Sequence, residues 1–264
     1  MRYEELLRMY ESEDHYWWFV GRRRLIRALV EKYAPDARRI LDVGCGTGGT
    51  LDALVGLGDL TGVDLSEDAL GFCRSRGHRN LARGLAEALP FRDGSADVVL
   101  GCDLLEHMEN DAVGLAELLR VARPGGTIII TVPAYRWLWS EHDEAISHLR
   151  RYSASDIRGM VEAIDARLVK LTYAVSLVFP IVVAFRVLSR LRLRPMGKPH
   201  TQLMSLPPWA NRILIWLHDL ETWWVTRAGF PCGTTVLAVL RAPDQPEAAQ
   251  PGQAAPAAKT GAVV

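Results

Sequence analysis

The sequence predicts an α/β fold, in which a seven-stranded, mostly parallel sheet carries helices on both faces. Two observations lead to this prediction. From residue 38 onward, short apolar runs alternate with segments of helix length, and the first run leads into a glycine-rich stretch at Asp42–Gly49. Strands separated by helices form right-handed βαβ crossovers, which build parallel sheets. Ligands of such sheets bind at the carboxyl ends of the strands.

Each expected strand is a short run of apolar, often β-branched residues. The seven runs cover residues 39–44, 60–65, 80–85, 97–102, 127–132, 167–175 and 234–241. Between them we expect helices at 50–56, 66–76, 111–122 and 153–164, and a turn at Pro124–Gly126. Ser66 and Ser153 are the first residues of two of these helices, where a hydroxyl oxygen can accept a hydrogen bond from a free backbone N–H.

Three segments lie outside the predicted core of residues 36–175 and 232–242. Residues 1–35 are expected to form an N-terminal helical lid, made of a polar helix ending near Glu13 and a basic helix at Gly21–Tyr33. The aromatic run His15–Phe19 lies between them. It suits either a lid over a bound substrate or a hydrophobic staple that joins the two helices. Residues 176–231 predict a helical insertion before the last strand, and the Ala-, Pro- and Gln-rich residues 243–264 predict a disordered tail.

Composition excludes several classes of protein. The 31 basic and 31 acidic residues cancel, so a nucleic-acid partner is not expected. The four cysteines are far apart and form no CxxC pair, which argues against a disulfide framework and against a zinc site, and we expect no metal. The charged and aromatic N-terminus does not resemble a signal peptide, so a cytoplasmic protein is expected. The sequence does not specify an oligomeric state.

The glycine-rich stretch predicts a nucleotide-type ligand site. Gly44, Gly46 and Gly48 allow a sharp turn and a close approach of the backbone to a ligand, and the next helix offers free N–H groups. Asp64, twenty residues after Gly44, ends the next predicted strand and can accept both hydroxyl hydrogens of a ribose. Asp42 precedes the loop and would repel a pyrophosphate but attract a cationic group. A nicotinamide oxidoreductase is therefore the weaker alternative.

Four segments in order resemble the class I methyltransferases, and in particular the subgroup that includes ubiquinone- and menaquinone-methylating enzymes. They are ILDVGCGTG, GVDLS, AEALPF and DVVLGCDLLEHM. The resemblance covers residues 38–134 strongly and the final strand, GTTVLAVL, weakly. It implies a Rossmann-like fold with S-adenosylmethionine as the cofactor.

The resemblance also implies where the cofactor binds. The methionyl part would lie on the loop, the ribose on Asp64, the adenine beside Leu65 and the sulfonium at the end of the fourth strand. Many relatives carry Asp where this chain has Leu85, so the contact to the adenine amino group is expected to be weaker or to come from the backbone. The expected cofactor residues are Asp42, Gly44, Cys45, Gly46, Gly48, Asp64, Leu65, Ala86, Glu87, Cys102 and Asp103.

The segment 133–152, after the fifth strand, is the expected acceptor wall, because it gathers histidines, arginines, an aspartate and aromatic rings within twenty residues. Its His142 with Asp143, or its His148, could form a base with an orienting carboxylate. Arg151, with Tyr152 beside it, is a candidate for holding an anionic group, whereas Arg150 is expected to dock the loop. His107 could reach the methyl group or merely cap a helix.

The insertion has two interpretations. Its tryptophans and flanking basic residues suit a peripheral membrane contact at the inner face of the membrane, and a helical cap or a dimer interface is the alternative. The string from HYWWF to GRRR resembles a bacterial subgroup of these methyltransferases, some members of which are linked to surface glycan or lipid pathways, and this supports a site rather than a particular substrate. The expected activity is methyl transfer to an oxygen of a lipid-linked or glycan-like acceptor. The alternatives are methylation of a soluble small metabolite and a non-catalytic cofactor-binding regulator.

Overall fold

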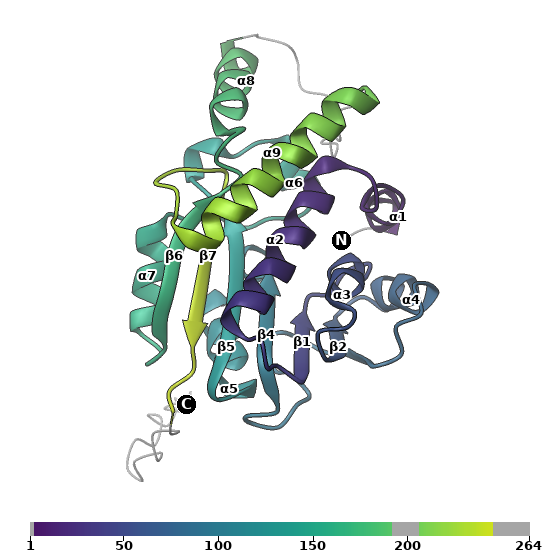
Figure 1. The fold of residues 1–264 in the computed structure, drawn as a ribbon, viewed down its shortest axis with the longest axis vertical. Coiled ribbons are helices and arrows are strands. Elements are labelled where there is room, and N and C mark those ends of the chain that lie inside the picture. Colours follow the sequence, from purple (N-terminus) through teal and green to yellow (C-terminus); the bar gives the residue numbers. More distant parts are fainter. Residues whose placement is uncertain (1–2, 192–205, 245–264) are drawn as a thin grey trace, which may run out of the picture.

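The computed structural model describes residues 3–191 and 206–244, which form one sheet flanked by helices (Figure 1). The strand order is β3-β2-β1-β4-β5-β7-β6, and β7 runs antiparallel to both of its neighbours. This confirms the predicted seven-stranded, mostly parallel sheet. The strands are β1 (Arg39–Val43), β2 (Asp59–Asp64), β3 (Leu81–Arg83), β4 (Ala96–Cys102), β5 (Ala122–Pro133), β6 (Arg167–Ala174) and β7 (Thr235–Arg241).

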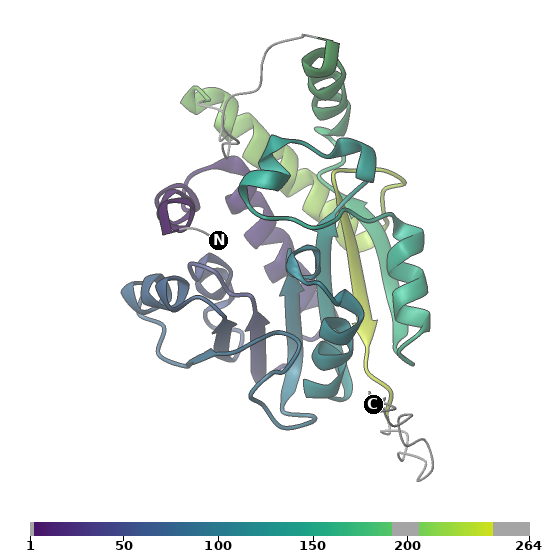
Figure 2. The same ribbon diagram turned by 180° about the vertical axis from the view of Figure 1, so that it is seen from behind.

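Helices cover both faces of the sheet, as Figures 1 and 2 show from opposite sides. Helices α2 and α9 pack on one face, with α3 and α4 beyond them, and α5 and α7 pack on the other. The helices are α1 (Tyr3–Ser12), α2 (Trp17–Tyr33), α3 (Gly49–Leu54), α4 (Glu67–Ser75), α5 (Asp111–Val121), α6 (Glu141–Ala145), α7 (Ala154–Glu162), α8 (Phe179–Leu191) and α9 (Pro208–Arg227), with short 3₁₀ turns η1 (Leu105–His107) and η2 (Arg136–Leu138).

The apolar runs of the strands are explained by burial on both sides. In β4, Val98 and Leu100 pack toward α2, whereas Val99 between them packs toward α5. All three side chains are fully buried. Alternate side chains of a strand point to opposite faces, so a sheet covered on both faces needs continuous rather than alternating apolar residues.

Two local predictions were wrong. Helix α2 begins at Trp17 rather than Gly21, so the end of the aromatic run forms its first turn. Tertiary contact explains this start, because Asn211 of α9 accepts the N–H of Trp17 at 2.9 Å. The expected turn Pro124–Gly126 lies within β5, where the register with β4 shifts. Such a shift accommodates extra residues as a bulge.

Helix α9 lies directly against α2. Gly21 makes this possible, because a Cβ there would approach the ring of His218 to 2.3 Å. The two helices are also joined by an ion pair between Arg24 and Asp219 at 2.6 Å. The second half of the predicted insertion is therefore part of the layer that covers the sheet.

Glu221 of α9 fixes the junction between β6 and α8. Its buried carboxylate accepts the backbone N–H groups of Val175, Ser176 at 2.8 Å and Leu177 at 3.0 Å. Val175 has a φ of 56°, an unusual value for a β-branched residue. The carboxylate of Glu221 thus stabilises a sharp turn of the backbone that the residues at the turn do not themselves favour.

Among the described residues, none of the helices combines the length and apolar character needed to cross a membrane. The uncharged stretch 171–185 is divided between the end of β6 and the start of α8. Two predicted segments lie outside the described residues. They are the middle of the insertion, residues 192–205, and the predicted disordered tail from residue 245 onward.

Candidate active site

The glycine loop lies at the carboxyl edge of the sheet, between β1 and α3. Gly44, Gly46 and Gly48 have φ values of 74°, 54° and 88°. These values are in the left-handed region, where a side chain would be strained, so the path of the loop depends on glycine. The N–H groups of Gly44 and Cys45 both donate to the carbonyl oxygen of Val63, which ties the loop to β2.

Asp42 is a buried carboxylate immediately before this loop. Its Oδ2 has no hydrogen-bond partner among the described residues. Desolvation raises the pKa of Asp42 to about 7, with Arg22 opposing the rise and Asp64 adding to it. A buried oxygen without a partner is costly unless a ligand satisfies it. The structure therefore offers one anionic position that suits a cationic ligand group.

Arg22 of α2 reaches the same edge of the sheet, and the sequence did not single it out. Its Nη2 donates to Thr131 Oγ1 at 2.6 Å and its Nη1 pairs with Asp103. Thr131 in turn donates to Asp103 at 3.1 Å. The pKa of Cys102 rises to about 12, mainly because the thiol is buried, although Arg22 opposes this. The only signal for Arg22 was its place in the basic stretch GRRR.

Asp64 connects the loop to the next strand. Its two oxygens accept the N–H of Gly46 at 3.0 Å and the N–H of Ser66 at 2.8 Å. Leu65 and Leu85 beside it are 56% and 51% exposed. Exposed apolar side chains at a strand end provide a surface on which a flat ring can pack. Ala86 and Glu87 follow Leu85 and are half-buried.

The N-terminal segment covers the loop. Met9 lies so close that a Cβ on Gly46 would approach its Cε to 2.9 Å. Glu13 accepts a hydrogen bond from Thr47 Oγ1 at 2.7 Å and pairs with Arg76 at 2.7 Å. These contacts place α1 and the residues after it directly over the predicted cofactor site.

In the segment expected to bind the acceptor, one buried aspartate organises the neighbouring charges. Asp143 accepts hydrogen bonds from Arg151 Nε at 2.8 Å and Nη2 at 3.0 Å, and contacts His148 Nδ1 at 2.9 Å. Burial alone would raise the pKa of Asp143, but these hydrogen bonds hold it well below its usual range. The carboxylate of Asp143 is therefore ionised, and both of its oxygens are engaged by Arg151 and His148.

Two residues expected in the catalytic set make hydrogen bonds within the chain. Arg151 also donates its Nη1 to the carbonyl oxygen of Ala134 at 3.0 Å, so all three of its guanidinium nitrogens have partners in the chain. Tyr152 is 4% exposed and donates to Asp111 at 2.8 Å. Arg150 also pairs with Asp111, at 3.0 Å, as a docking contact. His142, half-buried, has a pKa lowered mainly by desolvation.

An aromatic cluster lies beside this segment, at the carboxyl ends of β5 and β6. The Tyr135 ring stacks on Tyr173 at 5.2 Å and on Trp137 at 5.6 Å, measured between ring centroids. Phe179 at the start of α8 lies 5.7 Å from Tyr135. Trp137 is 45% exposed, so the cluster presents a partly open apolar surface.

Known proteins that are similar to this chain are methyltransferases. The family model described as "Methyltransferase domain" matches residues 41–130. A fatty-acid O-methyltransferase of Mycolicibacterium smegmatis is 33% identical over 146 residues, which are 50% of this chain and 53% of that protein. A ubiquinone biosynthesis O-methyltransferase of Methylococcus capsulatus is 35% identical over 139 residues, 46% of this chain and 57% of that protein. The chain spans about half the length of the curated relatives it matches.

Solved structures share the fold. Phosphoethanolamine N-methyltransferase 2 of Haemonchus contortus, in complex with S-adenosyl-L-methionine, has a TM-score of 0.54 and 17% identity, covering 84% of this chain and 52% of that one. The family match identifies residues 41–130 as a methyltransferase domain, and the loop and the strand order are those of the class I fold, whose cofactor is S-adenosylmethionine. This cationic cofactor fits the site, because Asp42 Oδ2 is buried without a hydrogen-bond partner among the described residues and the glycines of the loop leave room for a ligand close to the backbone.

Proposed function

We propose that the protein transfers the methyl group of S-adenosylmethionine to an oxygen of an apolar, lipid-linked or glycan-like acceptor. The observation that carries methyl transfer is the unpartnered buried oxygen of Asp42 at the glycine loop of a methyltransferase domain. The aromatic cluster of Tyr135, Trp137, Tyr173 and Phe179 supports an apolar acceptor. Two O-methyltransferases among the relatives are named for a fatty acid and for ubiquinone biosynthesis.

The donor side of the proposed site uses charge complementarity. The methionyl end of the cofactor carries an ammonium and a carboxylate, which match Asp42 and Arg22 respectively. A guanidinium has five N–H donors, so Arg22 retains donors beyond those given to Thr131 and Asp103. We assign the ribose to Asp64 and the adenine to the exposed Leu65 and the half-buried Ala86 and Glu87. The bound cofactor supplies an activated methyl group on a sulfonium.

The chain must also orient the acceptor and receive its proton. Asp143 holds Nδ1 of His148, as an orienting carboxylate holds a catalytic base. His142 and His107 are alternative bases from the same edge of the sheet. Helix α1 and Glu13 after it would exclude water from the donor, since Met9 and Glu13 already contact the loop.

Methyl transfer can be tested with purified protein, isotope-labelled cofactor and a bacterial extract divided into lipid and water-soluble fractions. We expect calorimetry to show binding of S-adenosylmethionine but not of NAD, and mass spectrometry to find labelled methyl in the lipid fraction. Label found only in the water-soluble fraction would favour the soluble-metabolite alternative. Binding without any label transfer would favour the non-catalytic regulator.

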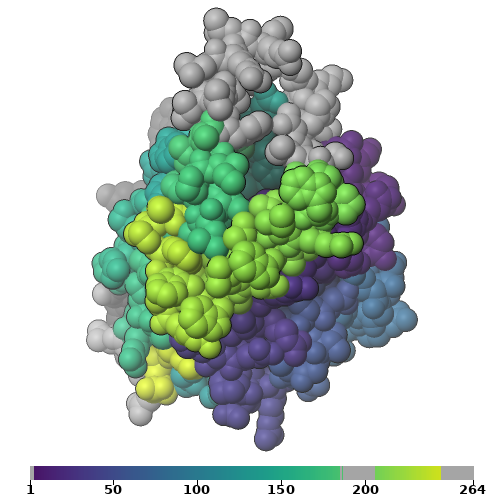
Figure 3. Space-filling view, turned by 45° about the horizontal axis from the view of Figure 1, so that its top comes forward, coloured from purple at the N-terminus to yellow at the C-terminus, as the bar shows by residue number. Residues whose placement is uncertain are grey.

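We further propose that the outer face of α9 contacts a lipid surface. Helix α9 lies at the surface on the face seen in Figure 3. Large apolar side chains recur every three or four residues along one side of this helix and form a stripe. Its members are 44% to 67% exposed. Tryptophan is favoured at membrane interfaces. The stripe consists of Trp209, Ile213, Trp216, Leu220, Trp223 and Trp224.

This contact predicts the outcome of a vesicle sedimentation assay. The wild-type protein should sediment with anionic vesicles, and the double variant Trp209→Ser, Trp216→Ser should lose at least tenfold in partitioning, because two exposed rings leave the interface. Val113→Ser on α5 is the matched control, since Val113 is 41% exposed on the opposite layer. Equal sedimentation of the wild type and the double variant would contradict the proposal.

A further inference from the structure

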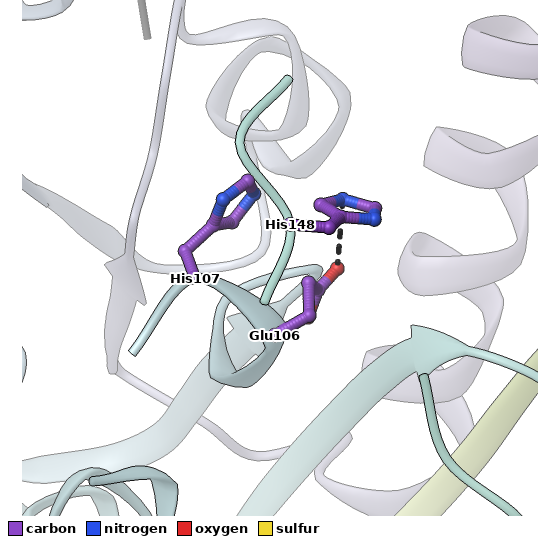
Figure 4. A group of neighbouring side chains, drawn as sticks. All are labelled: Glu106, His107 and His148. Carbon is purple, nitrogen blue, oxygen red and sulfur yellow. Dashed lines mark ion pairs between the residues drawn. The ribbon is translucent and has the colours of Figure 1, made fainter. Parts of the chain in front are cut away.

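We propose that Glu106, His107 and His148 form a binding site for a divalent metal ion of the Zn²⁺ type. One ligand atom from each of the three residues lies within 4.8 Å of the other two. Figure 4 shows the Glu106 carboxylate pointing toward the His148 ring, with the His107 ring beside them. The spacing of the cysteines led us to expect no metal, and no short motif joins these three residues in the sequence.

Glu106 provides the first independent observation. It is fully buried, and neither carboxylate oxygen has a hydrogen-bond partner among the described residues. Nε2 of His148 lies 3.7 Å from Oε1, which is too long for a hydrogen bond. Ligand atoms about 2.1 Å from a tetrahedral metal lie about 3.4 Å apart. A cation therefore fits between the Glu106 and His148 atoms with a shift of a few tenths of an ångström, and the ligand atom of His107 lies within 4.8 Å of both.

The two imidazoles provide the second observation. Nδ1 of His148 contacts Asp143 Oδ1 at 2.9 Å, and Nδ1 of His107 contacts the carbonyl oxygen of Ser147 at 3.3 Å. Metal-binding histidines use one ring nitrogen in this way, for a carboxylate or a carbonyl oxygen, and bind the metal with the other. In both residues the remaining nitrogen is Nε2. The bidentate pair with Arg151 keeps Asp143 ionised and fixed.

The ligand set indicates the kind of ion and its use. Two imidazoles and one carboxylate suit Zn²⁺ and related divalent transition metals, and three protein ligands leave a coordination position open, as in catalytic sites. His107 is exposed, so the open position is accessible. An acceptor hydroxyl bound there would have a lowered pKa. His148 would then act as a ligand rather than as the base.

Metal binding can be measured without any methyl transfer. We would titrate the untagged, full-length protein with Co²⁺, follow the visible absorption of the ion, and then displace it with Zn²⁺. One Co²⁺ per chain is expected. His107→Ala should weaken binding about 100-fold, because loss of one of three ligands exceeds the loss seen for residues that only orient ligands. Since His107 is exposed, this variant should fold normally.

Two further variants test the assignment. Glu106→Gln keeps the shape of the side chain but removes its charge, and should also weaken Co²⁺ binding at least tenfold. His142→Asn is the matched control, because His142 belongs to the same segment but not to the cluster, and it should keep the wild-type affinity. Absence of stoichiometric binding in the wild type, unchanged affinity in His107→Ala, or an equal loss in His142→Asn would each overturn the site. S-adenosylmethionine binding in the same samples reports separately on the donor site.

Discussion

Replacement of Asp42 by Asn should weaken S-adenosylmethionine binding by about 10- to 100-fold at pH 7.5, the usual value of a hydrogen bond to a charged group. Asp42 is buried, and its Oδ2 has no partner until a ligand provides one. The amide of Asn keeps the volume of the side chain but cannot neutralise an ammonium. Isothermal titration calorimetry gives the dissociation constant directly.

The same carboxylate predicts how affinity changes with pH. The pKa of Asp42 is raised to about 7, so the group takes up a proton as the pH falls from 8 to 6. A cationic ligand binds the ionised form, and the ionised fraction falls about tenfold over this range, so the wild-type affinity should fall by about the same factor. Affinity in Asp42→Asn should be flat between these pH values.

Asp64 offers a matched control for this pH effect, because its charge raises the pKa of Asp42. Asp64→Asn should weaken binding through the ribose but retain a pH dependence, with its midpoint moved to lower pH. A wild-type affinity that does not change between pH 6 and 8 would show that Asp42 does not face the charge of the ligand. An unchanged affinity in Asp64→Asn would contradict the ribose assignment.

Replacement of Asp143 by Ala should cause the largest loss of stability. It leaves the buried Arg151 guanidinium without its bidentate partner and frees Nδ1 of His148. Breaking a buried ion pair from one side costs about 3–5 kcal/mol, which corresponds to a fall in Tm of about 10 °C for a chain of this size. Differential scanning calorimetry at neutral pH measures this difference.

Two variants complete this test. Asp36→Ala, at an exposed turn, should stay within about 0.5 kcal/mol of the wild type. Removing both partners, with Asp143→Leu and Arg151→Met, should recover part of the loss, because no uncompensated charge remains. If Asp143→Ala melts at the wild-type temperature, the buried cluster does not contribute to the fold.

The strands and the cofactor loop were predictable because their signals are local. Asp42, Gly44 and Asp64 lie at fixed positions relative to apolar runs, and the topology of a parallel sheet brings such positions to one edge. The start of α2 at Trp17 was not predictable, because it depends on Asn211 in a distant helix. The Pro124–Gly126 segment has the composition of a turn but is held in β5 by pairing along the strand.

The acceptor segment 133–152 was less predictable, because the ion pairs of a folded chain depend on which charged residues the fold brings together. The residue types in 133–152 suggested an anion site and a base, yet the sequence could not show that Arg151 is bound by Asp143 rather than free. Arg22 was missed for the same reason, since it comes from the N-terminal segment and reaches Thr131 across the sheet edge. Glu106 was not among the predicted site residues, because the sequence does not show that its two carboxylate oxygens are buried without a hydrogen-bond partner among the described residues.

The three hydrogen bonds of Glu221 have a consequence for orientation. They attach α9 to the junction at Val175–Leu177, only two residues before Phe179 of the aromatic cluster. The buried carboxylate of Glu221 thus connects α9, which carries the outer stripe, to the segment that leads into the aromatic cluster. Any surface that binds α9 therefore also determines the direction in which the aromatic cluster faces.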